Sequence, residues 1–274
     1  MYEKFLEFCS ATGLKENTVR KYRNDLKTLT RHLGRPLWKL TKPLCGKFFS
    51  KIEGNGYSEA TKNHYKITIR KFIKWKNGEV PKFLEPYLKI KEYNIIRPLP
   101  YILDEREMLK ILSCCKNLQE KTFFGIIMET GCRADELIST KLKEVHFDNI
   151  GGLIIRPGKG GRLRRIRIIK TGEWLKKHYV IRSQLGKEKL FDYNYWQVRG
   201  ILRRLERISK IGKHLNLHLF RKVVATKLAS KMTEYQLCQA MGWVPGSRSA
   251  RHYVFMSGRD IDPVLKKLNS GSWN

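Results

Sequence analysis

The amino-acid sequence predicts a mainly α-helical protein with one small antiparallel β-sheet, divided into two domains. Apolar residues recur every three or four positions through residues 1–80, which is the spacing of amphipathic helices. Residues 81–103 contain four prolines and no helical period, which is typical of a linker between domains. Between residues 144 and 169, three β-like runs alternate with glycine-rich turns, and this pattern indicates strands joined by hairpins.

The first domain, residues 1–85, is predicted to be a small helical bundle. One helix is expected around residues 19–33, a second between Pro43 and Gly54, and a third from Ser58 onward. Proline suits a first helical turn, glycine ends a helix, and a serine hydroxyl can cap the free N–H groups at a helix start. The apolar faces of the first and third helices are Val19, Tyr22, Leu26, Leu29 and Leu33, and Tyr65, Ile69, Phe72 and Ile73.

Residues 86–103 are assigned to the linker and residues 104–274 to a larger, mostly helical second domain. Asp104 opens the first helix of this domain, with Glu107 three positions later in the arrangement of a capping box. A short tail helix is expected over residues 260–268, near the end of the chain. The β-like runs lie near residues 144–148, 152–156 and 164–169, with turns at residues 151–152 and 158–161.

The charge balance points to a polyanionic partner. Lys and Arg number 56 against 25 Asp and Glu, which gives a formal net charge of +31. A folded chain with that charge repels itself unless a polyanion neutralises it, and nucleic acid carries a dense row of phosphates. An anionic membrane surface or a ribosome-like RNA surface is the alternative reading.

Two helices of the bundle carry basic residues around their apolar faces. Arg20 and Lys21 lie on the first of these helices, and Lys62 and Arg70 lie on the third. We expect these four to contact DNA, because two basic helix faces on one bundle can grip a phosphate backbone. For each residue taken alone, an ordinary solvated side chain is the alternative.

Several classes of function are disfavoured by the sequence. The six cysteines form no CxxC pair and no zinc-like cluster with histidine, so we expect free thiols and no metal site. Residues 157–161 read Pro-Gly-Lys-Gly-Gly, which differs from the phosphate-binding loop of ATP-binding proteins. The first 18 residues are amphipathic rather than signal-like, and no apolar run reaches membrane-spanning length. We therefore expect a cytoplasmic protein that does not enter membranes.

Four local patterns bring together side chains that suit phosphate chemistry. Arg133 follows a glycine that ends an apolar helix, and Asp135 or Glu136 is close enough to orient its guanidinium. Lys159 occupies the tip of the predicted hairpin. The alternative interpretation is that Arg133 is a surface arginine in a turn and that Lys159 is a solvated lysine.

The third and fourth patterns lie nearer the end of the chain. His218 and Arg221 are three positions apart and therefore share one helix face. Trp243 follows a glycine at a helix end, where its indole N–H can donate a hydrogen bond, and Tyr253 opens an apolar run. Taken alone, His218 reads as a structural histidine and Tyr253 as a core aromatic residue.

The order of these patterns resembles the tyrosine recombinase (phage integrase) family over nearly the whole chain. Arginine, hairpin lysine, His-x-x-Arg, Gly-Trp and tyrosine occur in that sequence, and the segment MGWVPGSRSARHYVFMSGRDID is most similar to archaeal integrases. The resemblance implies a SAM-like, core-binding helical bundle followed by a tyrosine-recombinase catalytic domain. It also implies cleavage and rejoining of double-stranded DNA through a 3′-phosphotyrosyl intermediate, without metal, ATP or another cofactor.

The resemblance implies a role for each residue of the four patterns. Tyr253 is the expected nucleophile, and Arg133 and Arg221 are expected to clamp the non-bridging oxygens of the scissile phosphate. Lys159 is expected to protonate the leaving 5′ oxygen, and His218 to exchange a proton. Trp243 stands where many relatives have histidine, and Glu136 is expected to support the site.

The chemistry needs these residue types. Strand exchange builds negative charge on phosphate oxygens, which forked guanidinium donors stabilise. A phenol with a pKa near ~10 needs help to lose its proton, and the 5′ oxygen needs an acid to leave. The sequence departs from the family pattern in one spacing, because Tyr253 follows Trp243 by ten residues. This departure leaves Tyr179, Tyr193, Tyr195 and Tyr235 as lower-ranked nucleophiles.

We expect a site-specific recombinase from a mobile element that acts as a homo-tetramer on two DNA sites, with the tail helix docked on a neighbouring copy. A type IB topoisomerase is one alternative, since it uses similar tyrosine chemistry to relax supercoils as a monomer. A non-catalytic DNA-binding protein of recombinase descent is the other.

Overall fold

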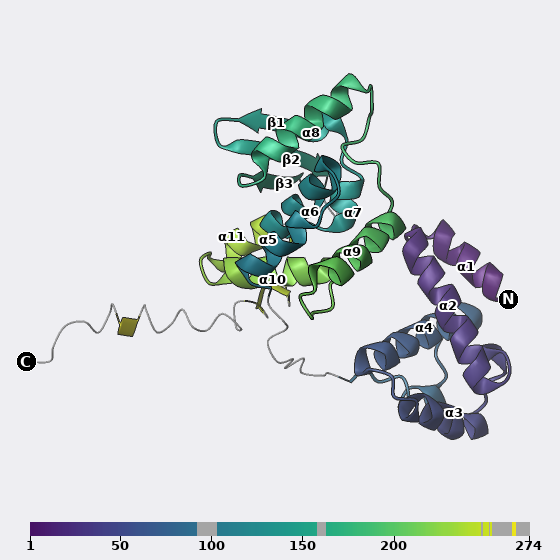
Figure 1. Cartoon of the computed structure of the whole chain (residues 1–274). Helices are drawn as coiled ribbons and strands as arrows, with labels where there is room; N and C mark the ends of the chain where they lie inside the picture. Colours follow the sequence, from purple (N-terminus) through teal and green to yellow (C-terminus); the bar gives the residue numbers. More distant parts are fainter. Residues whose placement is uncertain (92–102, 158–162, 248, 252, 254–264, 267–274) are drawn as a thin grey trace, which may run out of the picture. The chain divides into compact units, whose positions relative to one another are not determined.

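The structure is a computed structural model that describes residues 1–91, 103–157, 163–247, 249–251, 253 and 265–266 (Figure 1). The chain divides into two compact units, Met1–Ile96 and Arg97–Asn274. In the described residues, none of the helices is long and apolar enough to cross a membrane. Lys159 and most of the predicted tail helix lie outside the described residues.

The first unit is a helical bundle built around aromatic residues. Phe5 and Phe72 are fully buried and meet edge to face, with ring centroids 5.4 Å apart. The Ser58 hydroxyl accepts a hydrogen bond from the backbone N–H of Thr61, as predicted for a helix start. The elements are α1 (Tyr2–Ala11), α2 (Glu16–Leu33), η1 (Leu37–Lys39), α3 (Lys42–Gly54), α4 (Glu59–Asn77) and η2 (Lys82–Leu84).

The second unit combines helices with one three-stranded sheet. Asp104 and Glu107 cap α5 reciprocally, as the sequence predicts. The helices are α5 (Glu105–Ser113), α6 (Leu118–Thr130), α7 (Ala134–Ile138), η3 (Leu142–Glu144), α8 (Gly172–Gln184), α9 (Tyr195–Ser209), α10 (Leu217–Ala229) and α11 (Glu234–Met241). The strands are β1 (Val145–Asp148), β2 (Gly151–Pro157) and β3 (Leu163–Ile168).

The sheet is antiparallel in the order β1–β2–β3, and its strands occur close to the predicted positions. The turn predicted at residues 151–152 lies instead at residues 149–150, because both glycines pair with β1. Figure 1 shows the strands side by side with α8 next to them. β2 and β3 bracket residues 158–162, and Arg156 pairs with Arg164 close to that bracket. Side chains of directly paired residues lie on the same face of a sheet, so both arginines leave the sheet on one side.

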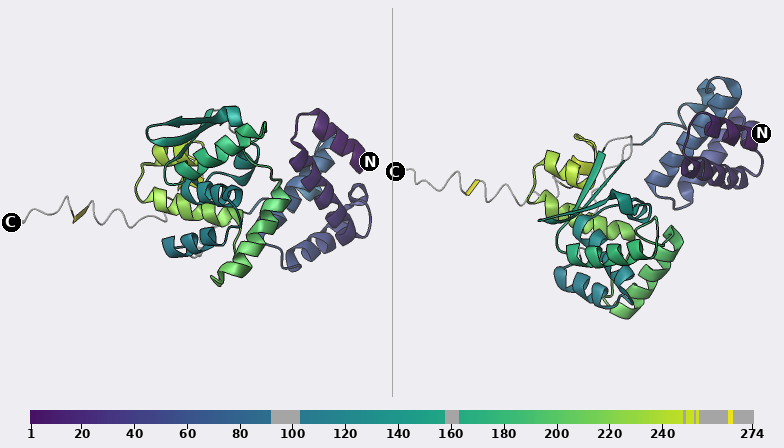
Figure 2. Two further views of the ribbon diagram at one scale, coloured as in Figure 1. Left: turned by 45° about the horizontal axis from the view of Figure 1, so that its top comes forward. Right: turned by 90° about the horizontal axis from the view of Figure 1, so that it is seen from above.

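Two apolar clusters hold the second unit together. The larger is centred on α6, whose side chains Phe123, Phe124, Ile126 and Ile127 are fully buried. The smaller joins α10, α11 and Tyr253. In Figures 1 and 2, α10 and α11 lie beside each other and α11 lies at β3. The ends of α6, α10 and α11 and strand β3 are therefore brought to one place.

Candidate active site

Arg133 sits at the turn between α6 and α7, where the sequence predicts it. Gly131 ends α6 in the left-handed conformation, with φ of 61°. A Cβ on Gly131 would lie 3.0 Å from Cβ of Val224, so α10 packs directly against this turn. The Glu136 carboxylate accepts hydrogen bonds from the backbone N–H of Arg133 at 2.8 Å and from its Nη1 at 3.0 Å. Glu136 therefore orients Arg133, whereas Asp135 is exposed.

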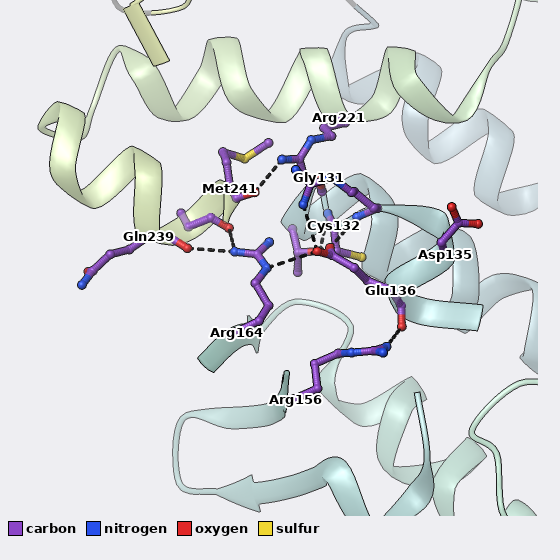
Figure 3. Close-up of polar contacts among 12 residues, drawn as sticks. Gly131, Cys132, Asp135, Glu136, Arg156, Arg164, Arg221, Gln239 and Met241 are labelled. Atoms are coloured by element: carbon purple, nitrogen blue, oxygen red, sulfur yellow. Dashed lines mark hydrogen bonds and ion pairs between the residues drawn. The ribbon is translucent and has the colours of Figure 1, made fainter. Parts of the chain in front are cut away.

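Arg221 projects from α10 into the same turn, and its side chain is largely buried, at 5% exposure. Its Nη1 donates to the carbonyl oxygen of Gly131 at 2.7 Å, and its Nη2 donates to that of Met241. Figure 3 shows the guanidinium held between these two chain segments. Burial, followed by repulsion from Arg133, lowers the pKa of Arg221 to about 10. The site thus holds more positive charge than its carboxylate balances.

Trp243 and Tyr253 stack on each other beside Arg221. Their ring centroids are 5.3 Å apart and the rings are nearly parallel, at 10°. The Arg221 guanidinium lies 5.3 Å from the centroid of the Trp243 ring, which is a cation–π arrangement. Gly242 ends α11 in the left-handed conformation and directs Trp243 toward this stack. The structure therefore brings Arg133, Arg221, Trp243 and Tyr253 together.

The phenol of Tyr253 is packed inside the smaller apolar cluster, with 8% of the residue exposed. Burial raises the pKa of Tyr253, and nearby Arg221 offsets part of that rise. At neutral pH the hydroxyl is therefore protonated. The phenol ring is therefore held between the Trp243 ring and the apolar residues of this cluster.

His218 lies in the first turn of α10, one helical turn before Arg221. The Asn216 side chain caps this helix by accepting from the backbone N–H of Leu219 at 2.8 Å. His218 is exposed. Desolvation by surrounding protein, followed by repulsion from Lys222, Arg221 and Arg133, lowers its pKa. The imidazole is therefore neutral at pH 7 and can accept a proton.

Two further arginines of the site are absent from the sequence prediction. Arg164 on β3 and Arg156 on β2 both reach toward Glu136 (Figure 3). Arg156 Nη1 donates to the carbonyl oxygen of Glu136 and, at 3.2 Å, to the Thr140 hydroxyl. The signal that marks Arg164 is strand alternation, because Arg164 shares the buried face of β3 with Ile166 and Ile168.

A pocket of about 240 Å³ opens in front of these residues. Arg133, Glu136 and Arg164 form its polar wall, and Trp243 forms part of its apolar wall. Tyr235 also lines the pocket and is exposed, so it is the lower-ranked tyrosine that lies nearest to the arginines in the described residues. Tyr193, by contrast, packs against Phe123 in the larger core.

The predicted DNA contacts of the first unit have different surroundings. Arg20, Lys21 and Arg70 are exposed, although Arg70 donates to the carbonyl oxygen of Leu88 at 3.0 Å. Lys62 is buried and its ammonium pairs with two carboxylates, so it does not lie on the exposed basic face predicted for it. The physical reason is that Glu53 on α3 and Glu59 face this side of α4 and bind its lysines.

Two family models match the chain. The Phage integrase family model matches residues 102–256, and the model of the phage integrase N-terminal SAM-like domain matches residues 2–79. The tyrosine recombinase XerA of Saccharolobus solfataricus is 26% identical over 239 residues, covering 82% of this chain and 78% of the relative. XerA of Pyrococcus horikoshii is 26% identical over 281 residues, covering 97% and 92%.

Solved structures of DNA-bound recombinases share the fold. XerH bound to a palindromic difH substrate, in a post-cleavage complex, gives a TM-score of 0.71 at 18% identity and covers 97% of this chain and 84% of that one. A lambda integrase tetramer bound to a Holliday junction gives 0.66 at 17% identity and covers 92% and 75%.

Proposed function

The chain belongs to the phage integrase family and is a tyrosine site-specific recombinase, and we propose that Tyr253 is the residue that attacks the DNA backbone. The phenol oxygen attacks phosphorus, a 3′-phosphotyrosyl bond forms, and the bond to the 5′ oxygen breaks. Attack by a free 5′ hydroxyl reverses these steps and joins the strands. The phosphate ester is conserved at each step, so the reaction needs no ATP.

Arg133 and Arg221 bind the scissile phosphate in this proposal. The observation that carries it is the meeting of Arg221 and Arg133 at the α6–α7 turn, where Arg221 donates to the Gly131 carbonyl oxygen and Arg133 pairs with Glu136. Burial, followed by the nearness of Arg133, lowers the pKa of Arg221 to about 10. A phosphate placed between the two guanidiniums relieves their repulsion and receives forked hydrogen bonds. The clamp becomes stronger as charge develops on the phosphate oxygens in the transition state.

The remaining roles concern protons. His218, neutral at pH 7, is placed on the α10 face that carries Arg221 and accepts a proton. Trp243 can only donate a hydrogen bond, so it supports the phosphate rather than acting as a base. Lys159 is proposed as the acid for the 5′ oxygen on the basis of its place in the sequence pattern.

The test of this proposal is covalent trapping on a nicked suicide substrate. Wild-type protein should accumulate a protein–DNA adduct, and Tyr253→Phe should not. Tyr235→Phe is the matched control, because Tyr235 lines the pocket of Arg133 and Arg164, and this variant should trap DNA as wild type does. Mass spectrometry of the adduct peptide identifies the attacking residue. A phosphopeptide containing Tyr235, or an adduct with Tyr253→Phe, would contradict the assignment.

We also propose that four copies act on two double-stranded DNA sites and that residues near the chain end connect neighbouring copies. This part rests on the family and on the tetrameric lambda integrase complex. Deletion of residues 258–274 should abolish recombination while monomeric DNA binding is retained. Unchanged strand exchange by the shortened protein would refute the role of the tail.

Supercoil relaxation separates this proposal from a topoisomerase-like activity. A recombinase should cleave only its paired target sites, whereas a topoisomerase relaxes arbitrary supercoiled DNA as a monomer.

The first unit would add phosphate contacts through exposed Arg20, Lys21 and Arg70, with the partnered Lys62 as the remaining candidate. Replacing Arg20 by Ala should reduce the salt dependence of DNA affinity by about one phosphate contact.

A further inference from the structure

Arg164 is the most deeply buried cation of the site, with 4% exposure. Burial lowers its pKa, and moving a guanidinium from water into protein costs several kcal/mol unless the charge is compensated. In the structure, the groups that compensate this charge are two backbone carbonyls and a carboxylate. Its contacts within the chain therefore define its role.

One set of contacts is with the carboxyl end of α11. Arg164 Nη1 donates to the carbonyl oxygens of Gln239 at 2.8 Å and Ala240 at 2.7 Å. The next carbonyl, that of Met241, accepts from Arg221. Free carbonyls at a helix end carry partial negative charge and attract cations. Arg164 and Arg221 together thus bind three consecutive carbonyls, and Gly242 and then Trp243 follow in the chain.

The other contact is with the carboxylate that orients Arg133. Arg164 Nε lies 3.8 Å from Glu136 Oε1, and the same oxygen accepts from Arg133 Nη1 at 3.0 Å. The Arg164 guanidinium is therefore a second link between the α6–α7 turn and the end of α11, beside the one that Arg221 makes (Figure 3). In the described part of the chain, no other side chain contacts both Glu136 and the last carbonyls of α11.

Gly242 provides an independent observation. A Cβ at this position would lie 2.9 Å from Arg164 Nε and 3.0 Å from its Cδ and Cζ. The backbone after α11 therefore passes directly over the guanidinium, at a distance that only glycine permits. This close approach fixes the position of the backbone that leads into Trp243.

We infer that Arg164 is a positioning residue for strand cleavage: it holds the end of α11 against Glu136 so that Arg133, Arg221 and Trp243 surround one phosphate. This inference rests on the proposed function. It assigns Arg164 no contact with substrate. Its loss lets the two guanidiniums drift apart, and a displacement of about 1 Å in such a clamp is enough to slow a reaction about 100-fold.

The experiment compares Arg164→Met, Arg164→Lys and Arg165→Met in the full-length protein. Arg165 is adjacent on β3 and exposed, so Arg165→Met is a matched control for the loss of one charge. Single-turnover cleavage is measured on a nicked suicide substrate with either a natural scissile phosphate or a neutral methylphosphonate. DNA affinity and the urea midpoint are measured alongside.

We expect Arg164→Met to cleave the natural phosphate about 100-fold more slowly than Arg165→Met. On the methylphosphonate, the ratio of the Arg165→Met rate to the Arg164→Met rate should be at least about tenfold smaller. The reason is that a neutral group depends less on well-placed cations. Arg164→Lys keeps the charge but lacks the fork, so its rate should lie between the two.

A purely structural role would lower the fraction of folded enzyme and slow both substrates equally. Equal slowing, or a rate within about threefold of Arg165→Met on the natural phosphate, would overturn the inference. If Arg164→Met does not fold, the slowing of Arg164→Lys on the natural phosphate is compared with its slowing on the methylphosphonate, and the same criterion applies. Failure of wild-type protein to form any adduct would instead refute the proposed function.

Discussion

Both units bury cations around a carboxylate, but they balance the charge differently. In the first unit, Lys62 pairs with Glu53 at 3.1 Å and Glu59 at 2.9 Å, and Lys66 pairs with Glu53 at 3.0 Å. Two buried ammonium groups thus meet two carboxylates, and the exposed ammonium of Lys91 lies 3.7 Å from Glu53 as well.

In the second unit, Glu136 alone faces Arg133 and Arg164, and Arg221 is held by backbone carbonyls. Among the described residues, Glu136 is the carboxylate that pairs with these arginines. The difference teaches that a balanced cluster fixes a helix pair, whereas a cation-rich cluster retains charge for a phosphate.

The largest expected effect separates chemistry from stability. Arg221→Ala should reduce the cleavage rate about 1000-fold or more, because it removes half of the phosphate clamp. Lys66→Ala should instead lower the free energy of unfolding by about 1–3 kcal/mol and leave cleavage per folded molecule unchanged. Single-turnover assays measure the cleavage rate of each variant, and urea unfolding measures its free energy of unfolding. Loss of cleavage by folded Lys66→Ala would erase the distinction between the clusters.

Neutralising the central carboxylate of each cluster sharpens the comparison. Glu136→Gln should destabilise the protein by about 2–4 kcal/mol, because Arg133 and Arg164 then lack their shared anion. Added target DNA should raise the melting temperature of Glu136→Gln more than that of Glu53→Gln, since a phosphate replaces the missing charge only in the second unit. Equal shifts would show that no phosphate enters the cation-rich cluster.

The close approach of Gly242 to Arg164 gives a smaller effect. Gly242→Ala should cost about 1–3 kcal/mol, because φ is 62° and the new Cβ would press on the guanidinium. Gly246→Ala is the control, because Gly246 has a similar φ of 72° and nothing within 4 Å of its Cβ position. The difference between the two unfolding free energies measures the contact. No difference would mean that Arg164 shifts freely.

The smallest effect is the acid sensitivity of the balanced cluster. Partial burial opposes the shift, but hydrogen bonds from Lys66 and Lys62 lower the pKa of Glu53 from 4.5 to about 2. A lowered folded pKa means that the stabilisation is present above pH ~4.5 and is lost as the pH falls toward ~2. Glu53→Gln should flatten the melting temperature over that interval. An unchanged slope would contradict the pairing.

The sequence predicts best where apolar periodicity or motif order carries the information. The helices of the bundle, the capping box at Asp104 and the three strands occur where expected. The structure also brings together Arg133, Arg221, Trp243 and Tyr253. Motif order identifies these residues although they are far apart in the chain.

What the sequence does not reveal is which cations are buried. Lys62 and Lys66 look like a solvated face until α3 places Glu53 beside them, and that contact is between helices. Arg164 stands in the run Leu-Arg-Arg-Ile-Arg-Ile, where alternation puts it on the face of Ile166 and Ile168 but does not show what covers that face. The packing of α11 against β3 shows that the guanidinium of Arg164 binds the last carbonyls of that helix, while Arg165 is exposed.

The stacked phenol of Tyr253 has a consequence for how the protein coexists with DNA. A buried, protonated hydroxyl is a poor nucleophile, so under the proposed function Tyr253 needs activation before it attacks. Leaving an aromatic stack costs about 0.5–1.5 kcal/mol beyond the buried area, which is small beside the binding energy of a cognate site. Under the proposed function, release of the ring is therefore one part of the cost of cleavage, and the binding energy of a cognate duplex exceeds it.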